Sequence, residues 1–240
     1  MVVKSFGKFI LEAFASMDTW TSKGSTLGTN PGGTYEAPDK GKHYVKFYHD
    51  PEQAKIEHAT GKIYNLLGIH TPETKLISHQ GKLGIASRWN DNLQKMRPVS
   101  AKTPEQAKQL GRMYHAAVIT KNWDIVGLDH ENIMHDTKTG DLHSLDHGGS
   151  MTFRAMGGRK EFDNGIGEKL SLRSAQNTAG PVFNKLFKAH PNLEKETAQS
   201  LKNLSHPVVQ GILKDAGLAN HKQLADTIMT RRDKHLASYE

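Results

Sequence analysis

Apolar and polar residues follow two different periods along this chain, and the changes of period predict its elements. Residues 43–48 alternate and are rich in aromatic side chains, which is typical of a strand. From Asp50 to Gly68 the apolar residues recur at helical spacing, after a cap residue and a proline that favour a helix start. Residues 74–79 and 82–89 are predicted to be two strands joined by a Gln-Gly turn.

The second half of the chain has mostly helical periodicity. Thr103 and Gln106 form a capping box, which predicts a helix that runs to about Lys121. A short hairpin is expected after it, with its turn at residues 137–140. From Arg173 onward the pattern is helical again. The breaks in this last region fall at Pro181, Pro191, Pro207 and Gly217.

Residues 21–43 have a different character, because glycine and other turn-forming residues dominate them, and they predict loops and turns. The order of elements predicts an α+β protein with two lobes. We expect a small β-rich N-lobe at residues 21–90 and a mostly helical C-lobe at residues 91–240, joined near residues 88–102. A chain of 240 residues can bury a proper core.

Residues 1–20 form an amphipathic segment with apolar residues at helical spacing. Glu12 interrupts the apolar run, so the segment is not a secretory signal. One interpretation is a helix that docks on the domain. The segment also resembles the capsid-targeting peptides of internal head proteins in tailed phages, with cleavage between Glu12 and Ala13. That resemblance implies a bacteriophage protein that is carried in the phage head and acts in the host cytoplasm.

Composition narrows the range of partners. Hydrophobic residues make up 36% and charged residues 24%, as in ordinary globular proteins, and no apolar run approaches the length of a membrane-spanning helix. With 0 cysteines there is no disulfide and no thiolate metal site. The net charge of +7 suits an acidic or polyphosphate ligand. The basic residues are spread along the chain, which argues against nucleic acid as the main partner.

Three polar residues lie around the predicted hairpin in an order that suits phosphoryl transfer. Asp124 follows the long helix, Asn132 begins the first hairpin strand, and Asp146 ends the second. Each residue alone is explained by a turn or a cap, but three in this order are harder to explain that way. Together they could orient a hydroxyl group and hold Mg²⁺.

The first half of the chain offers groups that could bind phosphate. Lys46 lies in an apolar strand, either as an edge lysine that blocks aggregation or as a contact to phosphates. Glu57, about two turns into the following helix, is our first choice as its partner; Glu52 is the alternative, but helix capping explains it better. Three glycines before this strand could let backbone N–H groups approach phosphate oxygens. They are Gly28, Gly32 and Gly33.

Four segments together resemble atypical protein-kinase-like proteins, namely HipA-type toxin kinases, phosphoinositide kinases and uncharacterised kinase-like phage proteins. These segments are residues 44–47, 67–73, 122–132 and 145–149. The resemblance implies that ATP and Mg²⁺ are the cofactors. It implies that Lys46 binds phosphate, that Glu57 orients Lys46 and that Asp124 acts on the acceptor. It also implies that Asn132 and Asp146 ligate Mg²⁺, and that a hinge containing Ala86 and Ser87 receives adenine.

The chain departs from the usual kinase pattern in two places. Kinases place about four residues between the catalytic Asp and the metal-binding Asn, and Asp124 and Asn132 are further apart. Asp129 is closer to Asn132 but too close for the pattern, so the catalytic residue is Asp124 or Asp129, and we favour Asp124. A His follows Asp146 where Phe is usual. Residues 151–160 occupy the place of an activation segment, as a substrate-facing loop or a solvated connector.

We therefore expect an ATP- and Mg²⁺-dependent phosphotransferase, with a Ser or Thr of a protein, such as a host protein, as the acceptor. One alternative is a non-catalytic protein, either a pseudokinase or a phage internal protein that only binds a partner. A lesser alternative is a metal-dependent hydrolase. It would use the group that clusters in sequence at His130, His135, His143, Asp146 and His147.

Overall fold

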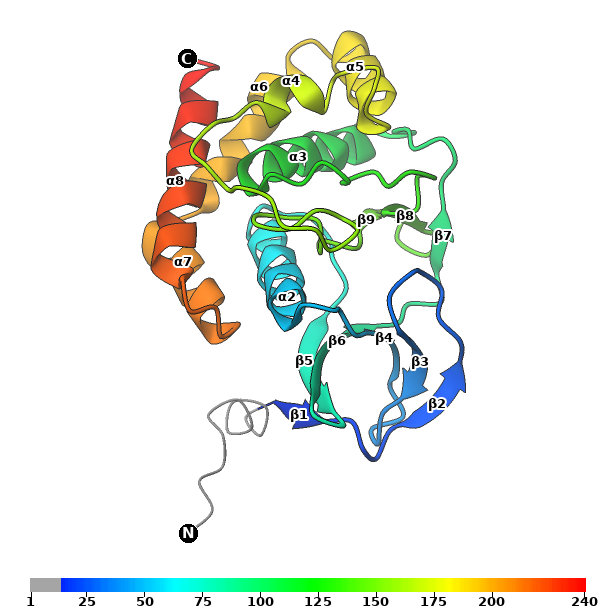
Figure 1. Cartoon of the computed structure of the whole chain (residues 1–240). Coiled ribbons are helices and arrows are strands. Elements are labelled where there is room, and N and C mark those ends of the chain that lie inside the picture. The colour runs from blue at the N-terminus through cyan, green and yellow to red at the C-terminus, as the bar shows by residue number, and fades with distance from the viewer. Residues whose placement is uncertain (1–13) are drawn as a thin grey trace.

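A β-sheet and a helix-rich half make up the computed structural model, which describes residues 14–240 (Figure 1). Most of the predicted N-terminal helix lies outside the described residues, and so does the whole of the predicted cleavage site between Glu12 and Ala13. Residues 14–20 are described, and they contain the short strand β1 (Ala15–Ser16), which pairs in parallel with β5.

The N-terminal half is a curled six-stranded sheet in the order β1-β5-β6-β4-β3-β2. Its other strands are β2 (Thr21–Gly24), β3 (Gly32–Glu36), β4 (Lys42–Lys46), β5 (Thr74–His79) and β6 (Lys82–Arg88). In this register Lys46 lies opposite Gly32 on one side and Ile85 on the other. The strands predicted at residues 43–48, 74–79 and 82–89 are therefore confirmed, with small differences at their ends.

The prediction that residues 21–43 are loops was wrong for two stretches, because β2 and β3 lie there. The glycines allow close pairing of strands. Gly32 and Gly33 both have a φ of 150°, and a Cβ on Gly32 would come within 2.0 Å of the carbonyl oxygen of Val45. Glycine thus marks a close approach of two backbones here, as well as a turn.

Helix α2 (Pro51–Leu66) connects the sheet to the rest of the molecule. Asp50 caps it by accepting a hydrogen bond from the N–H of Glu52 at 2.9 Å, as its sequence predicts. Ala54 packs with sheet residues, whereas Ile63 and Tyr64 belong to the large core that also contains the C-terminal helices. Figure 1 shows α2 between the sheet and α3, so one helix contributes to the packing of both halves.

The chain leaves the first sheet after Arg88 and enters a second one of three strands, in the order β7-β8-β9. These strands are β7 (Leu93–Lys95), β8 (Ile133–Asp136) and β9 (Leu142–Ser144). Between β7 and β8 lies α3 (Pro104–Thr120), whose N-terminal N–H groups are capped by Thr103. The predicted long helix and hairpin are both confirmed.

Helices make up the rest of the C-terminal half. They are α4 (Glu168–Ser171), α5 (Ala179–Ala189), α6 (Leu193–Ala198), the 3₁₀ helix η1 (Gln199–Asn203), α7 (His206–Asp215) and α8 (His221–Ala237). Helix α8 packs against α3 and α7. Within residues 14–240, none of the helices has the length and apolar character that crossing a membrane requires.

Candidate active site

Lys46 lies at the end of β4 and joins the two halves of the molecule. Its ammonium is 2.7 Å from Glu57 Oε1 on α2 and 3.1 Å from Asp146 Oδ1, which follows β9. Tyr48 donates a hydrogen bond to the second carboxylate oxygen of Glu57. The fold thus brings three predicted residues into one ion-pair network, although 100 positions separate the first from the last.

Lys46 attracts both carboxylates of this network, whereas the two carboxylates repel each other. Burial alone would lower the pKa of Lys46, but the carboxylates of Asp146 and Glu57 outweigh it and hold that pKa well above its usual value. Burial raises the pKa of Glu57 more than Lys46 lowers it. Lys46 is therefore a permanent cation at this site. Glu52, the alternative partner, instead accepts a hydrogen bond from Arg159.

Asp146 is held in an uncommon backbone conformation. Its φ is 52°, in the left-handed region that non-glycine residues rarely adopt. Burial alone would raise the pKa of Asp146, but the positive charge of Lys46 lowers that pKa below its usual value. The side chain remains 47% exposed, so one carboxylate can contact Lys46 and still face solvent. Asp adopts this region more readily than most residues, and here its carboxylate lies beside Lys46.

The loop after α3 places Asp124 beside Asn132. Helix α3 ends where Lys121 adopts a left-handed φ of 55°, and the N–H of Asp124 then bonds to the side chain of Asn122 at 3.1 Å. Asn132 Nδ2 donates to the backbone oxygen of Asp124 at 2.7 Å and to its Oδ2 at 3.2 Å. The eight-residue separation of these two residues is closed by the loop.

Asp124 and Asp129 have different environments. Burial, followed by the negative charges of Asp146 and Glu131, raises the pKa of Asp124 to about 6. Asp129 is 67% exposed and pairs with Arg97. In the structure Asp124 therefore contacts Asn132, whereas Asp129 pairs with Arg97 in the segment between β7 and α3.

The predicted glycine-rich segment lies in β3 and in the loop before it, and the predicted hinge residues lie in β6. Gly28 lies in the loop between β2 and β3, which is tied to β4 by a 3.0 Å hydrogen bond from the N–H of Leu27 to the Tyr44 hydroxyl. Ser87 lies opposite Tyr44, on the face of the sheet that carries Lys46. Ala86 points to the other face, where it packs with Val45.

The clustered histidines of the hydrolase alternative are dispersed by the fold. His147 is buried, and burial lowers its pKa to about 3, so it stays neutral beside Tyr64 and Ser144. His130 Nδ1 accepts a hydrogen bond from the N–H of Val99, while His143 stacks on His70. Among residues 14–240 no group of three or more His, Cys, Asp or Glu side chains is placed to hold a metal ion.

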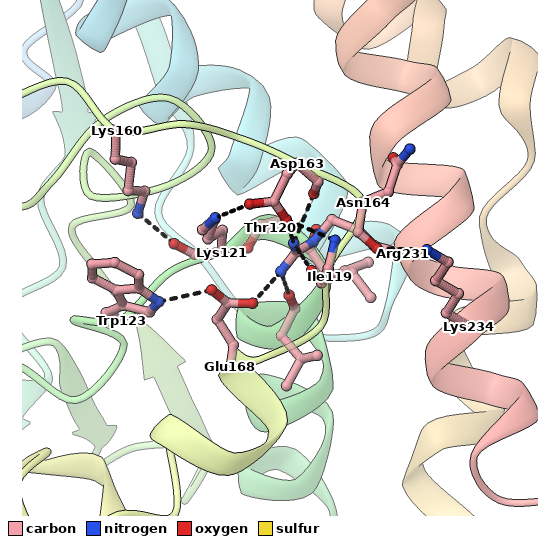
Figure 2. A network of polar contacts seen from close by, with 12 residues as sticks. Ile119, Thr120, Lys121, Trp123, Lys160, Asp163, Asn164, Glu168, Arg231 and Lys234 are labelled. Atoms are coloured by element: carbon pink, nitrogen blue, oxygen red, sulfur yellow. Dashed lines mark hydrogen bonds and ion pairs between the residues drawn. The ribbon is translucent and has the colours of Figure 1, made fainter.

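A buried polar network anchors the segment that follows Asp146 (Figure 2). Arg231 of α8 is 0% exposed, bonds to backbone oxygens of α3 and forms an ion pair with Glu168 of α4. Glu168 also accepts from the indole of Trp123 at 2.9 Å, next to Asp124. Lys160 donates to the carbonyl of Gly149 at 2.8 Å. Lys160 also donates to the carbonyl of Lys121 at 2.5 Å, so it holds the segment against the start of the loop that carries Asp124.

Sequence reasoning had not identified Tyr48 or Lys160 as members of the site. Tyr48 has a signal in the sequence, because it lies two positions after Lys46 and two-residue spacing places side chains on one face. Lys160 has no such signal. Burial lowers its pKa to about 7, and its contacts with the Asp124 loop arise only from the folded path of the chain.

The oxygen atoms at this site suit a hard divalent cation. Mg²⁺ prefers carboxylate and amide oxygens and keeps several waters and phosphate oxygens as its other ligands. The amide nitrogen of Asn132 is engaged by Asp124, which turns its oxygen the other way, and the half-exposed Asp146 offers a carboxylate. These two residues would hold the ion.

No described protein family matches the sequence, and no curated protein sequence matches it. Solved structures do. A proinflammatory kinase of Helicobacter pylori, CtkA, superposes with a TM-score of 0.60 at 14% identity, over 92% of this chain and 93% of that one. A 618-residue N-terminal fragment of LepB from Legionella pneumophila superposes with a TM-score of 0.52 at 12% identity, over 85% of this chain and 46% of the fragment.

At such low sequence identities, these superpositions establish the fold alone. The arrangement of the strands, α2 and the hairpin in this chain is consistent with that fold. The chain has an atypical protein-kinase-like fold with a curled β-sheet N-lobe and a helical C-lobe.

Proposed function

We propose that this protein is an ATP- and Mg²⁺-dependent phosphotransferase that acts on a Ser or Thr hydroxyl of a protein. One observation carries the proposal: Lys46 contacts Glu57 at 2.7 Å and Asp146 at 3.1 Å at the same time. A strand lysine paired with a helix glutamate, with the metal-binding Asp next to both, is the arrangement that kinases need for activity. A protein that only binds a partner has no need of it.

Each residue has a role that follows from its position. Lys46 contacts the α- and β-phosphates, and Glu57 keeps it oriented. The loop between β2 and β3, which contains Gly28, covers the phosphates, while Gly32 and Gly33 let β3 lie close against β4. The face of the sheet near Ser87 receives the base. Asn132 and Asp146 hold the metal, which when bound neutralises charge on the phosphates.

Asp124 is the group that orients the acceptor. A pKa of about 6 leaves it ionised at neutral pH yet able to accept a proton. The acceptor oxygen forms a bond to the γ-phosphorus, the bond to the β-phosphate oxygen breaks, the acceptor proton passes to Asp124, and ADP leaves. This assignment prefers Asp124 over Asp129, which lies in an ion pair with Arg97.

The test is transfer of label from γ-labelled ATP in the presence of Mg²⁺. The wild type is compared with Asp146→Ala and with Asp215→Ala, in which an exposed acid at the end of α7 is removed. Label is measured on the protein itself, on a generic protein and on a bacterial lysate, and the labelled residues are identified by mass spectrometry.

Label on Ser or Thr that disappears in Asp146→Ala and persists in Asp215→Ala would establish the function. If no label appears but ATP raises the melting temperature of the wild type and not of Asp146→Ala, the protein is a pseudokinase or transfers another group. If ATP changes neither label nor melting temperature, the phosphotransferase proposal is wrong.

A further inference from the structure

The segment after Asp146 folds back on itself. Residues 152–160 form a closed loop, in which the N–H of Arg154 bonds to the carbonyl of Gly158 at 2.7 Å and the N–H of Lys160 bonds to that of Thr152 at 2.9 Å. Phe153 at its base is fully buried. The guanidinium of Arg159 stacks 4.3 Å from the centre of the Phe153 ring, which fixes where this cation lies.

Arg159 reaches from this loop to the first turn of α2. Its Nη2 lies 2.5 Å from Asp50 Oδ2 and 3.0 Å from Glu52 Oε2. Asp50 is also the N-cap of the helix. The arginine thus binds two carboxylates that are both fixed to the start of α2, and a pairing with two acids constrains orientation more than a single surface ion pair does.

Gln53, on the same turn of α2, also contacts the segment that follows Asp146. Gln53 Nε2 donates to the carbonyl of Gly148 at 3.0 Å and lies 3.4 Å from that of Arg154. Gln53 is buried, one turn of helix before Glu57. The start of α2 is therefore attached to the segment at three side chains, and Glu57 follows directly from that attachment.

We infer that Arg159 is a positioning residue that holds the first turn of α2, and through it the Glu57–Lys46 pair, against the segment that follows Asp146. The loop supplies the cation and α2 supplies the two acids. The inference deepens the proposed function, because it names what sets the geometry of the same site.

The test compares Arg159→Gln and Arg159→Lys with a control, Lys108→Gln. Lys108 pairs with Glu196 at 3.1 Å on the helical half and has an exposure similar to that of Arg159, but it joins α3 to α6 rather than the segment to α2. Two readouts need no activity. They are backbone hydrogen exchange of residues 51–57, and the rate at which acetic anhydride acetylates Lys46, both measured by peptide mass spectrometry.

We expect Arg159→Gln to speed both readouts roughly three- to tenfold, Arg159→Lys to restore most of the protection, and Lys108→Gln to match the wild type. The rate of phosphate transfer should fall about tenfold in Arg159→Gln and recover in Arg159→Lys. Unchanged exchange and acetylation in Arg159→Gln would overturn the inference, as would faster exchange with undiminished transfer. A wild type that transfers nothing would defeat the proposed function alone, because exchange and acetylation would still decide the role of Arg159.

Discussion

Arg231 and Glu168 form a fully buried ion pair although 63 residues separate them in the chain. Arg231 also satisfies the carbonyls of Val118 and Ile119 at the end of α3. A buried charge that loses its partner is strongly destabilising. The pair therefore holds α8, α4 and the start of the Asp124 loop as one unit (Figure 2).

Replacing Arg231 by Met should lower the free energy of unfolding by about 3–5 kcal/mol, because Glu168 and several carbonyls would stay buried without their donor. Urea unfolding followed by circular dichroism measures this. Lys222 of the same helix is exposed, so Lys222→Met should change this free energy by about 0.5 kcal/mol or less. Equal losses in the two variants would contradict the role given to Arg231.

Lys46→Met should reduce phosphate transfer by about 100-fold or more, because it removes the cation that faces the phosphates. Glu57→Gln should have a smaller effect, about tenfold, since an amide oxygen can still accept a hydrogen bond from Lys46. Initial rates at saturating ATP measure both. Lys75, an exposed lysine of β5 in the same sheet, gives the control Lys75→Met, whose rate should equal that of the wild type.

Asp124→Asn and Asp129→Asn decide between the two candidate bases. Asp124→Asn should lower kcat by roughly 100-fold or more, because an amide cannot take the acceptor proton. Asp129→Asn should lower it far less, because that side chain pairs with Arg97 away from Asn132. The reverse order of rates would move the catalytic role to Asp129.

The pH dependence of transfer should follow Asp124. Its pKa of about 6 means that the carboxylate form, which can accept a proton, is lost as the pH falls below that value. We therefore expect kcat/KM to rise with pH up to about pH 6 and then to level off. A profile that is flat between about pH 5 and pH 7 would contradict the assignment.

Acidification should destabilise the fold through its buried histidines, four of which have strongly lowered pKa values. Burial lowers the pKa of His58 to about 4 and those of His147 and His235 to about 3, and it lowers that of His115 well below its usual value. The unfolded chain takes up protons below its histidine pKa of about 6.5 and the folded chain does not, so stability is present above that pH and falls below it.

The decline should reach at most about 1.4 kcal/mol per pH unit for each histidine between pH 6.5 and pH 4. Asp124 and Glu57 oppose it, because their raised pKa values let the folded chain bind protons in part of this range. Melting temperatures across this window measure the slope. His147→Phe should make the decline shallower, whereas changing the exposed His190 to Gln should not.

The sequence predicted those elements that local signals define. Asp50 and Thr103 cap their helices as expected, and the hairpin between Asn132 and Asp146 has its turn where turn residues cluster. The sequence did not predict strand β3, because glycines such as Gly32 and Gly33 are typical of loops. Only the close approach of the neighbouring strand β4 explains why glycines occur there.

The residues of the candidate site also divide into those that local sequence signals predict and those that they do not. Lys46, Glu57, Asn132 and Asp146 were predicted from their places in successive elements. The structure joins Lys46 to Glu57 and Asp146, and it joins Asn132 to Asp124. Spacing could not separate Asp124 from Asp129, because the path of the loop after Asn122 determines which one meets Asn132. Arg159 and Arg231 act over distances of about a hundred residues, and no local pattern marks either of them.

Helix α2 shares its apolar residues unequally between the two lobes. Ile56, Ile63 and Tyr64 belong to the C-lobe core, and Ala54 packs with the sheet. The helix also packs against β5 and β6, so moving either lobe away from it would expose apolar side chains to water. We therefore expect α2 to keep its place between the lobes when nucleotides enter and leave, so that Glu57 stays beside Lys46.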